Sequence, residues 1–223
     1  MKTATRITLA TLAIFFGLSI GTVILYRFIP IPGTPLMLIR KMSDGAPINY
    51  KWQPIEKISP DLSLAVIASE DNRFVQHSGF DYKEIKKARE EAKAGGRLRG
   101  ASTITQQTAK NLFLWQGRTW FRKGLEAYFT LLLETFWDKR RIMEAYLNCI
   151  EMGNGIYGAA AVAQINFGTT PDKLTSGQCA LIAATLPNPL RFNSAKPSKY
   201  ILKRKEDILK NMKNLPHNLR LQQ

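Results

Sequence analysis

The sequence predicts a mainly α-helical domain that follows one N-terminal transmembrane helix. An uncharged stretch near the N-terminus is long enough to cross a membrane, and segments with helical start and stop signals follow it. No stretch alternates apolar and polar residues for long enough to predict a central β-sheet, and there is no internal repeat. With 223 residues, 45% of them hydrophobic, the chain can form one main domain around a core.

The predicted anchor is the stretch Ile7–Tyr26, whose 20 uncharged residues would span about 30 Å as a helix. A cleavable signal peptide is the alternative, but its apolar core is normally only about 7 to 15 residues long. We therefore expect a cytoplasmic N-terminus at residues 1–6 and an uncleaved anchor at residues 7–27. Basic residues lie on both sides of the anchor, so charge alone does not decide its orientation.

A stiff connector should follow, because residues 29–35 contain three prolines and a glycine. We predict a linker at residues 28–49 and the main domain at residues 50–223. The first helix of that domain should begin after Ser59, with Pro60 at its first position, and should end at Glu70 and Asp71.

Further helices are predicted from caps and apolar spacing along the rest of the domain. Ser102 is expected to cap the helix that runs through Asn111, and glycine-rich basic residues should form a loop before it. The other predicted helices cover residues 82–93, 122–138, 140–149, 158 onward, 178–186 and 199–213. The last of these is basic and could lie on anionic lipid, although a solvated face is the favoured interpretation.

The chain is strongly basic, with 32 Lys and Arg against 17 Asp and Glu, which gives a net charge of +15. Such an imbalance favours a polyanionic partner: nucleic acid, an anionic membrane or a phosphorylated substrate. Cys149 and Cys179 lie in apolar or small-residue stretches, so we expect two buried free thiols rather than a disulfide.

Glu70 is a candidate general base, because a carboxylate at the end of an apolar helix is partly desolvated. The spacing alone favours a simpler interpretation, in which Glu70 and Asp71 cap or pair at the helix end and His77 is structural. The run Gly100–Phe113 is unusually polar for a helix. Its Ser102 and Thr103 would place hydroxyls and free N–H groups where an anion could bind.

Five segments, in this order along the chain, resemble the motifs of the family that polymerises lipid II, the glycosyltransferase module of penicillin-binding proteins. They are Glu70–Phe80, Ser102–Phe113, Arg122–Glu126, Arg140–Asn148 and Gly155–Ala161. The resemblance implies a lysozyme-like, two-lobed helical domain.

The resemblance also implies roles for single residues, with Glu70 as the general base and Glu126 as a second catalytic carboxylate across the cleft. It places on the substrate Asp71, Phe74, His77, Ser102, Thr103, Gln106, Gln107, Lys110, Asn111, Arg118, Arg122 and Lys123. It gives structural roles within the motifs to Gly79, Gly100, Glu144, Tyr146, Asn148, Gly153 and Gly158.

In the implied reaction, the 4-hydroxyl of lipid II attacks the growing undecaprenyl-diphosphate-linked chain, with inversion to a β-1,4 bond. The leaving diphosphate would be neutralised by Lys110, Arg118, Arg122 and Lys123. Glu126 would position those cations or hold Mg²⁺ or Mn²⁺, and no cofactor is expected to be obligatory. Without the resemblance, an ordinary i,i+4 salt bridge between Arg122 and Glu126 would be preferred.

The segment Leu112–Phe121 mixes aromatic and aliphatic residues with Arg118. Core packing and a lipid-facing wall of the cleft are equally good interpretations. Residues 164–168 depart from the family pattern, which leaves substrate contacts there uncertain. Because the chain ends at Gln223, we expect no transpeptidase domain and therefore no cross-linking activity.

The expected location is the cytoplasmic membrane, as a single-pass protein whose catalytic domain lies on the outer or periplasmic side. Expected partners are lipid II, the growing glycan chain, membrane lipids and proteins of cell division or cell-wall synthesis, but no nucleic acid. Two rival classes are a lysozyme-like hydrolase and a non-enzymatic basic module tethered to the membrane. The cations clustered around Glu126 argue against the hydrolase, because an uncharged glycosidic bond has no diphosphate to neutralise. Carboxylates among the basic residues argue against the binding module, because they would repel phosphate.

Overall fold

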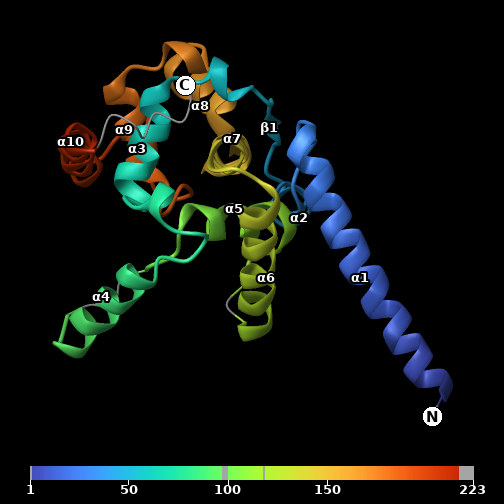
Figure 1. Cartoon of the computed structure of the whole chain (residues 1–223). Helices are drawn as coiled ribbons and strands as arrows, with labels where there is room; N and C mark the ends of the chain where they lie inside the picture. Colours follow the sequence, from blue (N-terminus) through green and yellow to red (C-terminus); the bar gives the residue numbers. More distant parts are fainter. Residues whose placement is uncertain (1, 97–99, 118, 216–223) are drawn as a thin grey trace.

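The structure is a computed structural model that describes residues 2–96, 100–117 and 119–215, and it is mainly helical as predicted (Figure 1). Its α-helices are α1 (Lys2–Phe28), α2 (Pro35–Asp44), α3 (Pro60–Glu70), α4 (Tyr82–Lys93), α5 (Ile104–Phe113), α6 (Trp120–Phe136), α7 (Lys139–Cys149), α8 (Gly158–Phe167), α9 (Ser176–Thr185) and α10 (Lys199–Asn214). Short 3₁₀ turns are η1 (Ile55–Lys57), η2 (Phe74–Gln76) and η3 (Pro171–Lys173).

The helices form two packed groups. Helix α3 packs against α9 and α10, whereas α5 packs against α6 and α7. Helices α4, α6 and α1 extend from the lower side of this body in Figure 1, with α4 pointing to the left, α6 downward and α1 to the right. The C-terminal end of α3 meets α5 at the boundary between the two groups, where the Gln107 amide of α5 donates to Glu70. This junction positions the candidate site.

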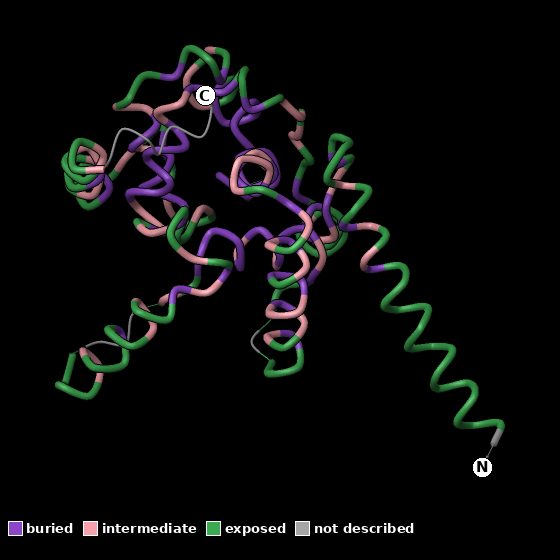
Figure 2. The backbone as a smooth tube through the Cα atoms, in the orientation of Figure 1, coloured by how far each residue is buried: buried purple, intermediate pink, exposed green. Residues whose placement is uncertain are grey.

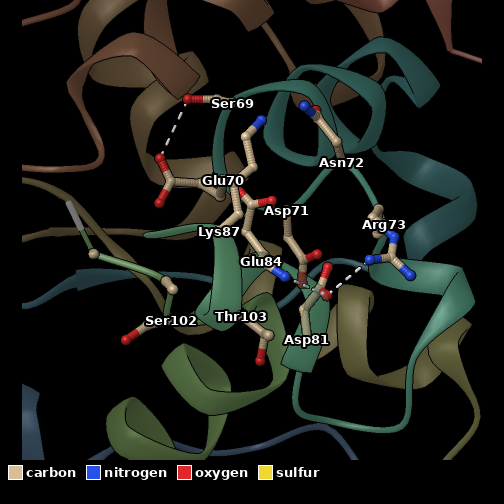
Figure 3. A pocket seen from close by; sticks show the side chains of 12 residues that line it. Ser69, Glu70, Asp71, Asn72, Arg73, Asp81, Glu84, Lys87, Ser102 and Thr103 are labelled. Carbon is tan, nitrogen blue, oxygen red and sulfur yellow. Dashed lines mark hydrogen bonds and ion pairs between the residues drawn. The ribbon is translucent and has the colours of Figure 1, made fainter. Parts of the chain in front are cut away.

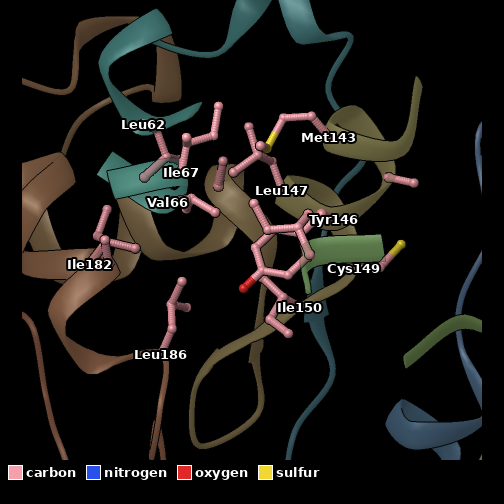
Figure 4. Packing of buried hydrophobic residues seen from close by; sticks show 14 of the residues in the cluster. Leu62, Val66, Ile67, Met143, Tyr146, Leu147, Cys149, Ile150, Ile182 and Leu186 are labelled. Atoms are coloured by element: carbon pink, nitrogen blue, oxygen red, sulfur yellow. The ribbon is translucent and has the colours of Figure 1, made fainter. Parts of the chain in front are cut away.

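Helix α3 is apolar on all sides, which predicts complete burial rather than a surface position. Residues 62–68 are all buried. In Figure 4, Leu62, Val66 and Ile67 of α3 lie among Met143 and Leu147 of α7 and Ile182 of α9. The core thus locks α3 from several sides, so the residue at its end has a fixed position.

Helix α1 is long and apolar enough to cross a membrane over residues 3–28, and most of it is exposed (Figure 2). Its C-terminal half is nevertheless attached to the domain by polar contacts. The Ser19 and Tyr128 hydroxyls lie 2.7 Å apart, and the Trp137 indole N–H donates to the Val23 carbonyl over 2.8 Å. The helix is therefore seated on α6 rather than joined to the domain by a free tether.

The segment 28–49, predicted as a linker, contains helix α2. Residues 29–34 are non-helical, but Pro35 stands at the first helical position, where its missing N–H carries no penalty. The Thr34 hydroxyl caps this helix, and Leu36 and Met37 are buried. The prolines therefore lead into a capped helix that packs against α5.

A small sheet, which the sequence did not reveal, joins distant parts of the chain. It contains β1 (Asn49–Tyr50), β2 (Glu151–Gly153) and β3 (Ile156–Tyr157) in the order β1-β3-β2. β1 pairs parallel with β3, and β2 pairs antiparallel with it. These strands have only two or three residues each, which is too short for an alternating pattern to be recognised.

Gly158→Ala should destabilise the protein strongly. Gly158 has φ of +76°, and a Cβ there would lie 2.1 Å from the Asn148 carbonyl oxygen. Backbone strain and the clash together should lower the free energy of unfolding by about 2–5 kcal/mol. Gly168→Ala is the matched control, because its φ is +60° but nothing lies within 4 Å, so about 1–2 kcal/mol is expected. Denaturant unfolding in detergent checks this, and equal losses would contradict it.

Candidate active site

Glu70 is the last residue of α3 and lies at the junction of the two helix groups. Each of its carboxylate oxygens has a neutral donor. The Gln107 amide donates to Oε2 over 2.9 Å, and the Ser69 hydroxyl donates to Oε1 over 3.2 Å. The carboxylate is partly buried, so these two donors fix its orientation while leaving one side open to the cleft.

Gln107 is itself fixed by Tyr146 of α7. The Tyr146 hydroxyl donates to Gln107 Oε1 over 3.2 Å. Burial raises the pKa of Tyr146 well above its usual range, with the nearby Glu70 and Asp71 charges adding to the effect, so the hydroxyl keeps its proton. Because the amide oxygen is engaged, the amide NH₂ must face Glu70. Tyr146 therefore determines which end of Gln107 meets the carboxylate.

Asp71 caps the start of α5 rather than projecting freely into the cleft. Its Oδ2 accepts from the Ile104 N–H over 3.1 Å, and its Oδ1 lies 3.0 Å from His77 Nε2. The Asp71 and His77 side chains are only 3% and 6% exposed. Both residues therefore hold the junction together in this structure.

The prediction that Ser102 caps α5 is wrong, because the cap is Thr103. The Thr103 hydroxyl accepts from the Gln106 N–H over 3.2 Å, and the Gln106 side chain accepts from the Thr103 N–H over 3.0 Å. This is a capping box, whose spacing of three residues was visible in the sequence. The N–H groups of Ile104 and Gln106, expected to be free for a substrate anion, are thus already bonded, and Ser102 lies exposed outside the helix.

Glu126 lies on the buried side of α6, where two cations pair with it. Arg122 donates to its Oε2 over 2.7 Å, and Lys123 bonds to its Oε1. The Arg122 Nε also donates to the Gly117 carbonyl over 2.8 Å, which fixes the guanidinium further. The i,i+4 pair expected from the spacing therefore exists, and it is buried, with side chains 9% and 4% exposed.

Lys110 is a partly buried cation on α5. Burial lowers its pKa, while the charges of Glu126 and Glu70 oppose that shift and those of Arg122 and Lys123 add to it. Its ammonium therefore lies within electrostatic range of both Glu70 and Glu126. Three cations and two carboxylates thus share one region between α3, α5 and α6.

A pocket of about 290 Å³ opens beside Glu70 (Figure 3). It is bounded by the end of α3, the start of α4 and the residues that precede α5, and its walls are charged. Arg73 pairs with Asp81 over 3.0 Å, and Lys87 of α4 also lines the pocket. Ser69, Arg73, Asp81 and Lys87 were not among the predicted site residues. Only Asp81 stands in a spacing that marks it, as the N-cap of α4, where its carboxylate accepts from the Glu84 N–H over 3.0 Å.

The remaining predicted site residues divide into buried and structural positions. Phe74 is fully buried in the core, so it does not reach a substrate in this structure, and Asn111 is 5% exposed, with its amide bonded to the Gln107 carbonyl.

Glu144 accepts from the Ile55 N–H, and Asn148 holds residue 53 through both its oxygen and its nitrogen. Gly79 (φ +84°) leaves no room for a Cβ, which would lie 2.7 Å from Thr130 Cγ2, whereas at Gly153 a Cβ would be in tight contact with the Ile156 side chain and at Gly100 it would face open space. Arg118 lies outside the described residues.

Comparisons with known proteins agree on one family. The family model described as Transglycosylase matches residues 37–213. A biosynthetic peptidoglycan transglycosylase of Bacteroides thetaiotaomicron is 59% identical over 210 residues, which cover 92% of this chain and 85% of the relative. Proteins with the same name from Caulobacter vibrioides and Bdellovibrio bacteriovorus are 54% and 51% identical, each over 88% of this chain and over 87% and 80% of their own length.

Arg122→Met should destabilise the protein much more than the same change at an exposed ion pair. It would leave the Glu126 carboxylate, 3% exposed, without its main partner, which should lower the free energy of unfolding by roughly 3 kcal/mol. Arg140→Met is the control, because Arg140 and Glu56 form an exposed pair worth less than about 1 kcal/mol. Denaturant unfolding in detergent would check both, and a loss at Arg122 no greater than that at Arg140 would show that the buried pair is unimportant for stability.

Proposed function

Because the chain belongs to the transglycosylase family and is a peptidoglycan glycosyltransferase, we propose that it polymerises lipid II into β-1,4-linked glycan strands. The observation that carries this proposal is that two carboxylates are held in fixed positions, Glu70 by the Gln107 amide and Glu126 by the cations of Arg122 and Lys123. The charges of both carboxylates act on Lys110.

In the proposed reaction, the growing chain is the donor and the 4-hydroxyl of a lipid II unit is the acceptor. The hydroxyl oxygen forms a bond to the donor's anomeric carbon as the bond from that carbon to the diphosphate oxygen breaks. Glu70 accepts the hydroxyl proton, and undecaprenyl diphosphate leaves with the bonding electrons. The held orientation of Glu70 suits this role, since a general base must point at the proton it removes.

The leaving diphosphate gains negative charge and needs cations more than it needs a proton. Among the residues that the structure describes, we assign Lys110, Arg122 and Lys123 to the neutralisation of this diphosphate. Glu126 positions two of them through direct hydrogen bonds. An uncharged glycosidic bond, as a hydrolase cleaves, would give this cluster nothing to neutralise.

The polar residues present do not favour a divalent cation as part of the site. Both Glu126 oxygens accept hydrogen bonds from cations, so a metal would have to displace one of them. Asp71, His77 and Asp81 have atoms within 4.8 Å of one another, but Asp71 caps α5 and Asp81 pairs with Arg73. We therefore assign no step of the reaction to a metal.

An apolar surface beside α1 supports a polyprenyl-linked substrate. An apolar pocket of about 260 Å³ lies between α1 and the stacked rings of Phe113 and Phe129. Phe113 stands three residues after Lys110, and Phe129 three residues after Glu126, so this pocket continues from the charged region along two helices. An isoprenoid chain fits such a surface.

The start of α6 fits a lipid-facing wall. Trp120 and Phe121 are 92% and 71% exposed, and α6 and α1 both extend from the lower side of the body in Figure 1. We propose that α1 anchors the protein in the cytoplasmic membrane and that the domain lies on its outer face, where lipid II is presented. We assign no peptide cross-linking to this site and expect other proteins of cell-wall synthesis to carry it out.

Glu70→Gln should abolish polymer formation. The amide cannot accept the proton in the same way, so the rate should fall by roughly 10²–10⁴-fold. The measurement is incubation of the detergent-solubilised protein with labelled lipid II, followed by separation of polymer from monomer. Glu206→Gln is the matched control, because Glu206 is exposed on α10, and its activity should match the wild type. Polymer from Glu70→Gln at the wild-type rate, or none from the wild type, would contradict the proposal.

Lys110→Arg should change the alkaline limb of the pH–rate profile. Burial lowers the pKa of Lys110, so its charge is lost at a lower pH than that of an ordinary lysine. If the charged form neutralises the leaving diphosphate, the wild-type rate falls as pH rises through that pKa. Arginine stays charged there, so the fall should move to higher pH. Profiles that coincide on the alkaline side would exclude this role for Lys110.

A further inference from the structure

Arg204 reaches from the C-terminal helix toward the end of α3, although it lies outside every motif that the sequence displays. Its Nη2 donates to the Ser69 hydroxyl oxygen over 3.3 Å. Ser69 precedes Glu70, and its hydroxyl lies 3.2 Å from Glu70 Oε1. Because α10 packs against both α3 and α9, this contact is supported by the helix packing. A single hydroxyl thus separates Arg204 from the candidate base.

The Ser69 hydroxyl has one proton and two acceptors within reach. They are Glu70 Oε1 at 3.2 Å and the Ala183 carbonyl at 3.4 Å. Arg204 occupies a lone pair of the Ser69 oxygen and polarises the hydroxyl, which strengthens its donation to a charged acceptor. The carboxylate is both nearer and charged, so the hydroxyl is directed at Glu70 rather than at the helix carbonyl.

Helix packing alone explains the aliphatic stem of Arg204 but not the surroundings of its head group. The Nε atom is buried without a hydrogen-bond partner. Among the described residues, Ser69 accepts the hydrogen bond of this guanidinium, and no carboxylate forms an ion pair with it. A partly buried charge without a counter-ion opposes folding, so its placement beside Ser69 calls for a reason other than stability.

We propose that Arg204 is a positioning residue for Glu70 and that it acts through the Ser69 hydroxyl. With Gln107 on Oε2 and Ser69 on Oε1, neither carboxylate oxygen can rotate away from the cleft. The Tyr146–Gln107 pair orients one oxygen from α7 and α5, and the Arg204–Ser69 pair orients the other from α10. This inference rests on the proposed role of Glu70 as the general base.

The test is a double-mutant cycle on the full-length protein with labelled lipid II. Arg204→Met and Ser69→Ala should each lower kcat by about tenfold with an unchanged KM, because the base is misdirected but the substrate still binds. The double variant should be no slower than either single variant, since both changes break the same connection. Lys203→Met, at an exposed neighbour on α10, is the matched control and should leave kcat and KM unchanged.

Three outcomes would overturn the proposal: an unchanged kcat in Arg204→Met, a raised KM with unchanged kcat, or losses that multiply to about hundredfold in the double variant. Arg204→Leu, which also removes the donor, replaces Arg204→Met in the cycle if the latter does not fold, as judged by its thermal unfolding midpoint. Glu70→Gln in the same assay separates the two claims. An active Glu70→Gln contradicts the proposed function, whereas an inactive Glu70→Gln beside a fully active Arg204→Met contradicts only the role of Arg204.

Discussion

The hydrogen bond between Gln107 and Glu70 joins the two helix groups at the point where the chemistry is proposed. Glu70 ends a helix that is buried on all sides, and Gln107 stands on a helix that packs against α6 and α7. The carboxylate can be held in one orientation only if both groups keep their positions. The core around α3, the Asp71 cap of α5 and the buried hydroxyl of Tyr146 all serve that requirement.

The positions of the charged residues near the site say more about the substrate than the net charge does. A net charge of +15 names only a class of anionic partner. Within the site, Arg122 and Lys123 are held by Glu126, so these cations are preorganised rather than free on flexible side chains. Helix α1, which is seated on α6, places apolar surface beside the same region, and this suits the proposed substrate with its charged diphosphate and lipid tail.

Local signals in the sequence predicted much of the fold. Helix α4 has the predicted bounds, α3 begins at Pro60 as expected, and the Arg122–Glu126 pair follows from helical spacing. The spacing of Thr103 and Gln106 also fits the capping box that starts α5. The contacts that orient Glu70 could not be predicted, because they join residues far apart in the sequence. Tyr146 lies 39 residues after its partner Gln107, and Arg204 lies 135 residues after its partner Ser69. Such contacts depend on how the helices pack, and no local pattern reports that.

The most direct test of the account is a structure of the protein with an unreactive analogue of the donor, in which a methylene group replaces the scissile oxygen and so converts the attached phosphate into a phosphonate. The account predicts that the diphosphate group lies against Lys110, Arg122 and Lys123, with the anomeric carbon on the side of the cleft that faces Glu70. A diphosphate bound instead beside Arg73 and Lys87, with Lys110 making no contact to it, would contradict the account. The cations around Glu126 would then have a structural role only.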